Sequence, residues 1–238
     1  MTIPIEDIRF GRRIDGGIGS TGCVYQGTWN CTEVAIKTVA STSPALQAMV
    51  QRASLDPEIQ RWHELNHPHI ALFLGACRGC APHAPGFEQL MLVNELLASS
   101  LYSLLHVHQK PNTRKKLKWS ARVRWAWHIC CGMEYLHENS LLHLDLKSPN
   151  VLLSVNSVHA KAKIADFGNM RFALELEGHA GAASGNIEET ATKIDNNPFS
   201  PQQVPKTRGL GTPEWMAPEL LEGSSNATEK CDVYSFSM

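Results

Sequence analysis

The chain has 238 residues, of which 43% are hydrophobic and 19% charged, a composition typical of a globular protein with one large domain or two lobes. Lysine and arginine number 22 and aspartate and glutamate 23, so the formal net charge is -1. This balance excludes a broad electrostatic surface for nucleic acid or anionic lipid. No stretch approaches the roughly 18 consecutive apolar residues of a membrane helix, and the N-terminus lacks a signal-peptide pattern, so we expect a cytoplasmic protein without a membrane span.

The seven cysteines are scattered along the chain without the spacing of a disulfide framework, which predicts reduced thiols. Cys77 and Cys80 form a CRGC pair with His83 nearby. A structural zinc site needs four ligands, and no second pair lies at a usable spacing. A metal at this pair is therefore the less favoured interpretation.

Short β-favouring runs alternate with glycine clusters from Ile8 to Lys37, which predicts a three-stranded antiparallel sheet. Residues 44–66 have helical spacing, and we expect Asp56 to cap a helix whose first residue is Pro57. The apolar runs IALFLGA and QLMLVNEL predict two further strands, with a loop over residues 79–88 between them.

The segment SARVRWAWHICCGMEYLH predicts a long helix packed on a core. The apolar stripe expected to face that core consists of Val123, Trp127, Cys130, Met133 and Leu136. Residues 177–207 are short of large apolar side chains and rich in small and polar ones, which predicts a mobile loop. Four hydroxyls between Asp166 and Glu219 are candidate phosphoacceptors: Thr190, Thr192, Ser200 and Thr207.

Gly17, Gly19 and Gly22 form a GxGxxG turn between two predicted strands. Glycines let backbone amides approach phosphate oxygens with no Cβ in the way. The motif alone is a weak signal, because glycine-rich hairpins without a ligand are about as common. In the VAIK strand that follows, Ala35 and Lys37 are expected to share one face, although an exposed lysine on a half-buried strand is the alternative.

HLDLKSPN at residues 143–150 contains Asp145 and Asn150, and a DFG motif follows with Asp166. Phosphoryl transfer requires metal ions, a group that orients or deprotonates the hydroxyl, and a cation on the phosphates. We expect Asp145 to accept or orient the substrate proton, and Asn150 and Asp166 to hold Mg²⁺. Lys37 would bind the α and β phosphates of ATP. Each residue alone could be a turn or capping residue, but chance does not readily place four such motifs in this order.

These motifs make the chain resemble eukaryotic protein kinases, and more narrowly the tyrosine-kinase-like group that includes Raf-like and plant-type MAP kinase kinase kinases. The narrower likeness rests on IEDIRFGRRI, NHPHIALFLGAC, DLKSPN and GTPEWMAPE. The resemblance implies a bilobal α+β fold. Its small antiparallel β-sheet lobe plus one helix would cover residues 1–93, its hinge residues 94–97, and its mainly α-helical, incomplete lobe residues 98–238.

The resemblance also implies roles for single residues. Glu58 would pair with Lys37, and Lys147 and Thr212 match positions that favour serine or threonine over tyrosine substrates. Asn94 would be the gatekeeper of the nucleotide site. The residues expected to contact the nucleotide are Gly17, Gly19, Gly22, Val24, Ala35, Lys37, Glu95 and Leu97.

Some features depart from the family pattern. Leu144 stands where an arginine usually precedes the catalytic aspartate, and leucine cannot bind an activation-loop phosphate. Pro57, directly before Glu58, puts the expected ion pair with Lys37 in question. The sequence breaks off at CDVYSFSM, where the family begins its central helix, so we expect a C-terminally truncated domain.

Two further roles follow from the resemblance. Asp232 would anchor the catalytic loop, and Glu219 would brace the end of the activation segment against an arginine that the truncated chain is expected to lack. The predicted function is a protein serine/threonine kinase with ATP and Mg²⁺ as cofactors, protein substrates, and a MAP-kinase-kinase-kinase-like signalling role. The alternatives are a kinase-like nucleotide-binding or scaffold protein without transfer activity, and a non-functional fragment that folds poorly.

Overall fold

The computed structural model describes most of the chain: residues 2–14, 22–38, 57–107, 117–166, 171–172, 211–222 and 227–238. The chain forms two compact units, which are described separately below. The first unit is Met1–Met133 with Ser148–Ala165, and the second is Glu134–Lys147 with Asp166–Met238. The loop expected over residues 177–207, with its four candidate phosphoacceptors, lies outside the described residues. The lobe boundaries at residues 93 and 98 stay a prediction.

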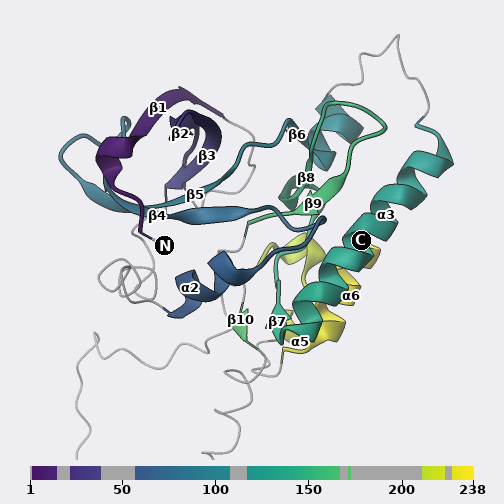
Figure 1. Ribbon diagram of the computed structural model, residues 1–238. Helices are drawn as coiled ribbons and strands as arrows, with labels where there is room; N and C mark the ends of the chain where they lie inside the picture. Colours follow the sequence, from purple (N-terminus) through teal and green to yellow (C-terminus); the bar gives the residue numbers. More distant parts are fainter. Residues whose placement is uncertain are drawn as a thin grey trace, which may run out of the picture. The chain divides into compact units, whose positions relative to one another are not determined.

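The first unit contains a five-stranded antiparallel sheet in the order β1-β2-β3-β5-β4 (Figure 1). A short 3-10 turn, η1, precedes it at Ile5–Asp7. The strands are β1 (Ile8–Arg13), β2 (Val24–Trp29), β3 (Thr32–Thr38), β4 (Phe73–Cys80) and β5 (Glu88–Glu95). The prediction of three strands followed by two more is confirmed, but β4 begins inside the IALFLGA run and continues through the CRGC pair.

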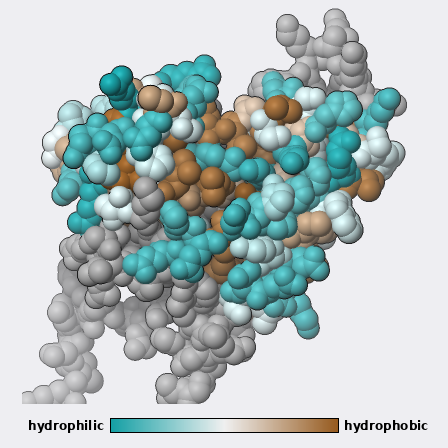
Figure 2. Space-filling view, in the orientation of Figure 1, coloured by the Kyte–Doolittle hydropathy of each residue, from teal (hydrophilic) through white to brown (hydrophobic). Residues whose placement is uncertain are grey.

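Buried and more exposed residues alternate along the strands, because successive side chains of a strand point to opposite sides. One face of the sheet is therefore buried. Val34, Ile36, Met91 and Val93 are all 0% exposed and belong to one core cluster. The other members of this cluster are Ile3, Ile8, Tyr25, Cys77 and Ala81. Figure 2 shows hydrophobic residues gathered over the same strands.

The two cysteines of the CRGC pair have different surroundings. Cys77 is 1% exposed within the core cluster, and burial raises the pKa of its thiol to about 12. Cys80, three residues further along the same strand, is exposed. In the part of the chain that the structure describes, no three His, Cys, Asp or Glu side chains are grouped to hold a metal ion. Cys77 therefore acts as a core residue.

The helix α2 spans Pro57–Glu64, so the prediction that Pro57 is the first helical residue is confirmed. Proline suits that position because it lacks an N–H that the helix would leave unbonded. A second sheet of the first unit has the order β6-β8-β9, with β6 at Ser99–Ser100, β8 at Val151–Leu153 and β9 at Ala162–Ile164. Two short helical turns accompany it, η2 (Ser103–Val107) and η3 (Ser148–Asn150).

The long helix α3 spans Trp119–Glu138 as predicted, but the stripe expected to face the core is partly wrong. Val123 and Trp127 are 62% and 67% exposed, and Cys130 is also exposed. Met133 and Leu136 are buried, as expected. The stripe that packs inward begins with Ala121, Trp125 and Ile129. The helix carries two apolar stripes, and periodicity alone does not tell which of them meets the core.

The second unit contains short elements around a small apolar cluster. β7 (Leu141–Leu142) pairs antiparallel with β10 (Arg171–Phe172). The other elements are η6 (Pro213–Trp215), α5 (Pro218–Leu221) and α6 (Glu229–Ser237). The cluster consists of Leu142, Leu144, Ala217, Leu220, Ala227 and Cys231. No helix among the residues that the structure describes is both long and apolar enough to cross a membrane.

Candidate functional site

One face of the first sheet carries the lysine and its predicted neighbours. Lys37 of β3 lies directly opposite Val24 of β2 and Leu92 of β5. Ala35 lies opposite Asn94 of β5. Directly opposed residues of antiparallel strands point to the same side, so these five side chains share a face. It is the face opposite to the one that Val34 and Ile36 bury, as the VAIK pattern predicted.

Gly22 is required where the glycine turn rejoins β2. Its φ is 134°, and a Cβ at this position would lie 1.7 Å from the carbonyl oxygen of Thr38. The next residue, Cys23, accepts a hydrogen bond from the Thr38 amide at 2.8 Å and donates its own amide to the Thr38 Oγ1 at 2.9 Å. The glycine therefore permits the close approach of two backbones. Gly17 and Gly19 lie outside the described residues, and their nucleotide contacts stay predictions.

Glu95, at the end of β5, already uses its amide and its carboxylate within the first unit. Its N–H donates to the Leu72 carbonyl at 3.0 Å, and its Oε1 accepts from the Leu72 amide at 2.7 Å and from the Lys163 Nζ at 2.5 Å. Leu97 follows half-buried. Glu58 is the second residue of α2. The adenine contacts of Glu95 and Leu97, and the ion pair of Glu58, stay predictions.

In the second unit, a lysine and a threonine fix the orientation of the Asp145 carboxylate. Asp145 is 6% exposed, and the Lys147 Nζ donates to its Oδ1 at 3.0 Å and to its Oδ2 at 2.8 Å. The Thr212 Oγ1 lies 2.7 Å from the same Oδ1 and 2.5 Å from the Lys147 Nζ. Charge-assisted hydrogen bonds of this kind are stronger than neutral ones. The structure thus brings together Asp145, Lys147 and Thr212, which the sequence had singled out separately.

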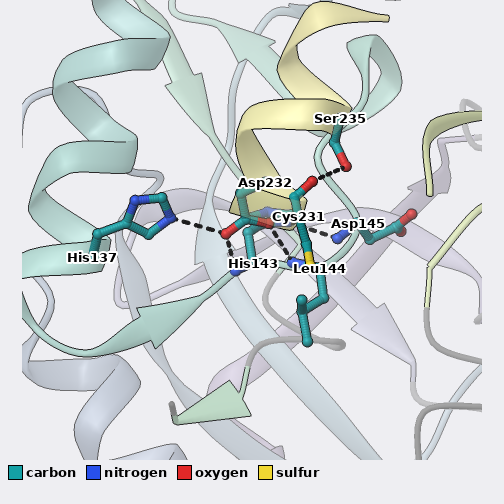
Figure 3. A network of polar contacts seen from close by, with 7 residues as sticks. All are labelled: His137, His143, Leu144, Asp145, Cys231, Asp232 and Ser235. Carbon is teal, nitrogen blue, oxygen red and sulfur yellow. Dashed lines mark hydrogen bonds and ion pairs between the residues drawn. The ribbon is translucent and has the colours of Figure 1, made fainter. Parts of the chain in front are cut away.

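Asp232 of α6 holds the backbone that carries Asp145 (Figure 3). It is 1% exposed, and its two carboxylate oxygens accept the amides of His143 at 2.9 Å and Leu144 at 2.8 Å. The anchoring role predicted for Asp232 is confirmed by these contacts. His137 of α3 adds a third contact, with 3.0 Å between its Nε2 and the Asp232 Oδ2. Sequence analysis did not identify His137, because a histidine near a helix end is a common surface feature.

Leu144 packs in the apolar cluster of the second unit. It is 5% exposed, and its backbone is left-handed with φ 61°. Gly211, with φ 84°, lies so close that a Cβ would be 2.6 Å from the Leu144 carbonyl oxygen. Met216 packs against the same cluster. The backbone of Leu144 therefore lies against Gly211, next to Thr212, and its side chain belongs to the cluster that Met216 packs against.

Glu219 of α5 contacts a residue that the sequence analysis did not connect with it. The Cys231 Sγ donates to the Glu219 Oε1 at 3.3 Å. Burial, as the largest cause, and the Glu219 carboxylate together raise the pKa of the Cys231 thiol to about 11. The thiol stays protonated and acts as a donor. Glu219 thus links α5 to α6, and its contact with the arginine that the resemblance implies stays a prediction.

The two residues expected to hold a metal ion have suitable chemistry, since a side-chain amide and a carboxylate offer the oxygen ligands that Mg²⁺ prefers. Asn150 closes η3 and is 8% exposed, and its main-chain carbonyl oxygen accepts the Ala165 amide at 2.9 Å. Asp166 has a left-handed backbone with φ 70°. A non-glycine residue in this conformation costs free energy and is often found at functional sites.

Comparison with known proteins agrees with these observations. Residues 12–238 match the family model described as the protein kinase domain. Over 97% of its length, the chain is 36% identical to the probable serine/threonine-protein kinase SIS8 of Arabidopsis thaliana. It is 31% identical to the serine/threonine-protein kinase CTR1 of the same plant over 99% of the chain, and 31% identical to the dual specificity protein kinase shkD of Dictyostelium discoideum over 92%.

The chain corresponds to only part of these relatives. It spans 18% of the length of the first and 24% of the length of the other two. The match therefore concerns one domain of longer proteins.

Proposed function

Since this chain belongs to the protein kinase domain family, we propose that it transfers the γ-phosphate of ATP to serine or threonine side chains of protein substrates. The observation that carries the proposal is the contact set of Asp145, in which Lys147 and Thr212 orient the carboxylate. A catalytic aspartate must be held within hydrogen-bond reach of the attacking hydroxyl, and rigid partners provide that orientation.

Each residue has a role in this proposal. Asp145 accepts or orients the proton of the attacking hydroxyl, and Lys147 stabilises negative charge on the transferred group. Lys37 binds the α and β phosphates, and Asn150 and Asp166 hold Mg²⁺. The metal, when bound, neutralises the charge that develops on the phosphate oxygens.

Adenine would lie against the face of the first sheet that carries Val24 and Ala35, with Asn94 as gatekeeper. Gly17, Gly19 and Gly22 would offer backbone amides to the phosphates, and Leu97 would contact the base. The shared face of Val24, Ala35 and Lys37 supports this assignment, because it presents an apolar floor and a cation on one side of a rigid sheet.

Two residues of the second unit support serine or threonine as the side chain that accepts the phosphate. Lys147 and Thr212 match the family positions that favour serine or threonine, and both contact Asp145. The phrases IEDIRFGRRI, NHPHIALFLGAC and GTPEWMAPE support membership of the tyrosine-kinase-like, Raf-like group and a MAP-kinase-kinase-kinase-like role in signalling.

The test measures transfer of labelled phosphate from ATP to three matched peptides that differ only in having serine, threonine or tyrosine as acceptor. We expect labelling of the serine and threonine peptides, loss of labelling when EDTA removes divalent cations, and recovery when Mg²⁺ is added in excess. The matched variants Lys37→Met and Lys118→Met distinguish a lysine of the proposed site from one outside it. Labelling of the tyrosine peptide alone would contradict the acceptor assignment.

A further inference from the structure

The strand β9 precedes Asp166 in the sequence, and its two edges are held in different ways. One edge pairs with β8, in the register Leu152 opposite Lys163 (Figure 1). Part of the other edge is covered by the turn that follows α2. The Ile164 amide donates to the His69 carbonyl at 2.8 Å, and the Ala71 amide donates to the Ile164 carbonyl at 2.7 Å.

Two histidine side chains complete that second edge at Ala162. The His69 Nδ1 lies 3.0 Å from the Ala162 carbonyl oxygen, so this nitrogen carries a proton and donates. The Ala162 amide donates to the His128 Nδ1 at 3.2 Å, so that nitrogen is unprotonated and accepts. The rings stack at 4.1 Å between centroids with 16° between their planes. Both polar groups of one edge residue are thus bound by imidazoles.

The surroundings of the His128 ring oppose a positive charge on it. The His67 ring lies 5.5 Å from the His69 ring, and the His67 Nδ1 accepts the His69 amide at 3.2 Å. Burial lowers the pKa of His128, and the charges of His69, Arg124 and Lys161 lower it further. Burial and His69 lower the pKa of His67. These groups come from the turn before β4, from α3 and from the residue before β9.

We propose that His69 and His128 are positioning residues that fix β9 only while the His128 ring is neutral, so that protonation of His128 releases this strand. A proton on the His128 Nδ1 would face the N–H of Ala162 and abolish that hydrogen bond. In the part that concerns catalysis, this inference rests on the proposed function, in which Asp166 follows β9 by two residues and holds Mg²⁺. The anchoring of β9 itself does not depend on activity.

The direction of the pH effect follows from the lowered pKa of His128. Its ordinary value is 6.5, so below about pH 6.5 the unfolded chain binds more protons than the folded chain. The stabilisation that neutral His128 provides is present above that pH and is lost as the pH falls through the lower, folded-state pKa. The folded protein should therefore melt at a lower temperature in mild acid.

The test compares the full chain with its His128→Asn variant. The asparagine Oδ1 takes the place of the Nδ1 as an acceptor and does not titrate. We expect the fall in melting temperature between about pH 7.5 and pH 5.5 to shrink to about half in this variant. His63→Asn, at an exposed histidine of α2, is the matched control and should leave the fall unchanged. An equal fall in the wild type and the His128→Asn variant would overturn the proposal.

Amide hydrogen exchange at Ala162 gives a second readout that requires no catalysis. We expect slow exchange at about pH 7.5 in the wild type and in His128→Asn, and fast exchange in His128→Leu, which has no acceptor. Equally fast exchange in all three would overturn the proposal. If the chain transfers phosphate, the acid limb of kcat/KM should move to lower pH in His128→Asn, with no change in its value near pH 8. A chain without transfer activity would contradict the proposed function and leave the melting and exchange tests intact.

Discussion

The two units hold a functional backbone segment by the same principle but with different chemistry. In the second unit, a buried carboxylate accepts the amides of His143 and Leu144. In the first unit, imidazoles bind both polar groups of Ala162. A carboxylate accepts with either oxygen, whereas a neutral imidazole accepts with a single nitrogen that a proton can occupy. The loop that carries Asp145 is therefore anchored by two acceptor oxygens, and β9 by a single acceptor nitrogen that mild acid would remove.

Removal of the carboxylate should have the largest effect. Asp232→Ala leaves two buried amides without an acceptor, and each such group costs about 1 to 3 kcal/mol. We expect the free energy of unfolding in urea to fall by about 3 kcal/mol or more. Asp232→Asn keeps one acceptor oxygen and should lose less. Equal losses in both variants would contradict the view that the number of accepting oxygens determines the stability of this loop.

Leu144 separates the contribution of apolar packing from that of the carboxylate. Leu144→Ala removes a side chain that is 5% exposed within the cluster of the second unit. Buried leucine to alanine changes cost about 2 to 5 kcal/mol, and we expect a value near the lower end because the cluster is small. Leu221→Ala, at a leucine of α5 that is 57% exposed, is the control and should change the unfolding free energy by less than about 0.5 kcal/mol.

Gly132 tests the anchor of the first unit without a change of charge. A Cβ at this position of α3 would lie 2.8 Å from the His69 carbonyl oxygen and 2.8 Å from the Ile164 Cδ1. Helix propensity alone would make Gly132→Ala stabilising by about 1 kcal/mol. We expect instead a loss of about 1 to 3 kcal/mol in thermal or urea unfolding, because the backbone of His69 must move. A gain in stability would show that the turn is not packed tightly against α3.

Mild acid should produce the smallest effect and should act on the first unit. Because the pKa values of His67 and His128 are lowered, stability should be full above about pH 6.5 and fall below it. We expect the free energy of unfolding to be lower at pH 5.5 than at pH 7, by less than the losses expected for the variants above. As the pH is lowered, residue-resolved amide hydrogen exchange should become faster first at β9, while the amides of His143 and Leu144 stay protected. Earlier loss of protection at the catalytic loop would reverse the comparison.

The sequence predicted those features that follow from local pattern. Strand alternation placed Val34 and Ile36 on the buried face and Lys37 on the other, and Pro57 marked the start of a helix, because both rules involve only neighbouring residues. The contact between Asp145 and Lys147 likewise joins residues two positions apart in one motif, whereas their catalytic roles stay predictions.

The features that the sequence did not predict depend on contacts between distant segments. Periodicity could not decide which stripe of α3 meets the core, and Trp127 was wrongly expected to be buried. Cys231, which contacts Glu219, and His137, which contacts Asp232, each come from a different element than their partner. The stacking of the His128 ring on the His69 ring likewise could not be predicted, since no sequence motif marks either residue.

The measurement that tests the central claim most directly is transfer of labelled phosphate from ATP with Mg²⁺ to a serine/threonine substrate, by the chain and by its Asp145→Asn variant. Asparagine keeps the shape of the side chain but not its charge, so melting temperatures should confirm that both proteins fold. We predict transfer by the chain and a decrease of about 100-fold or more in the variant, as expected for loss of a catalytic acid–base group. Equal transfer by both folded proteins, or none by either, would contradict the assignment of Asp145 as the catalytic residue of an active kinase.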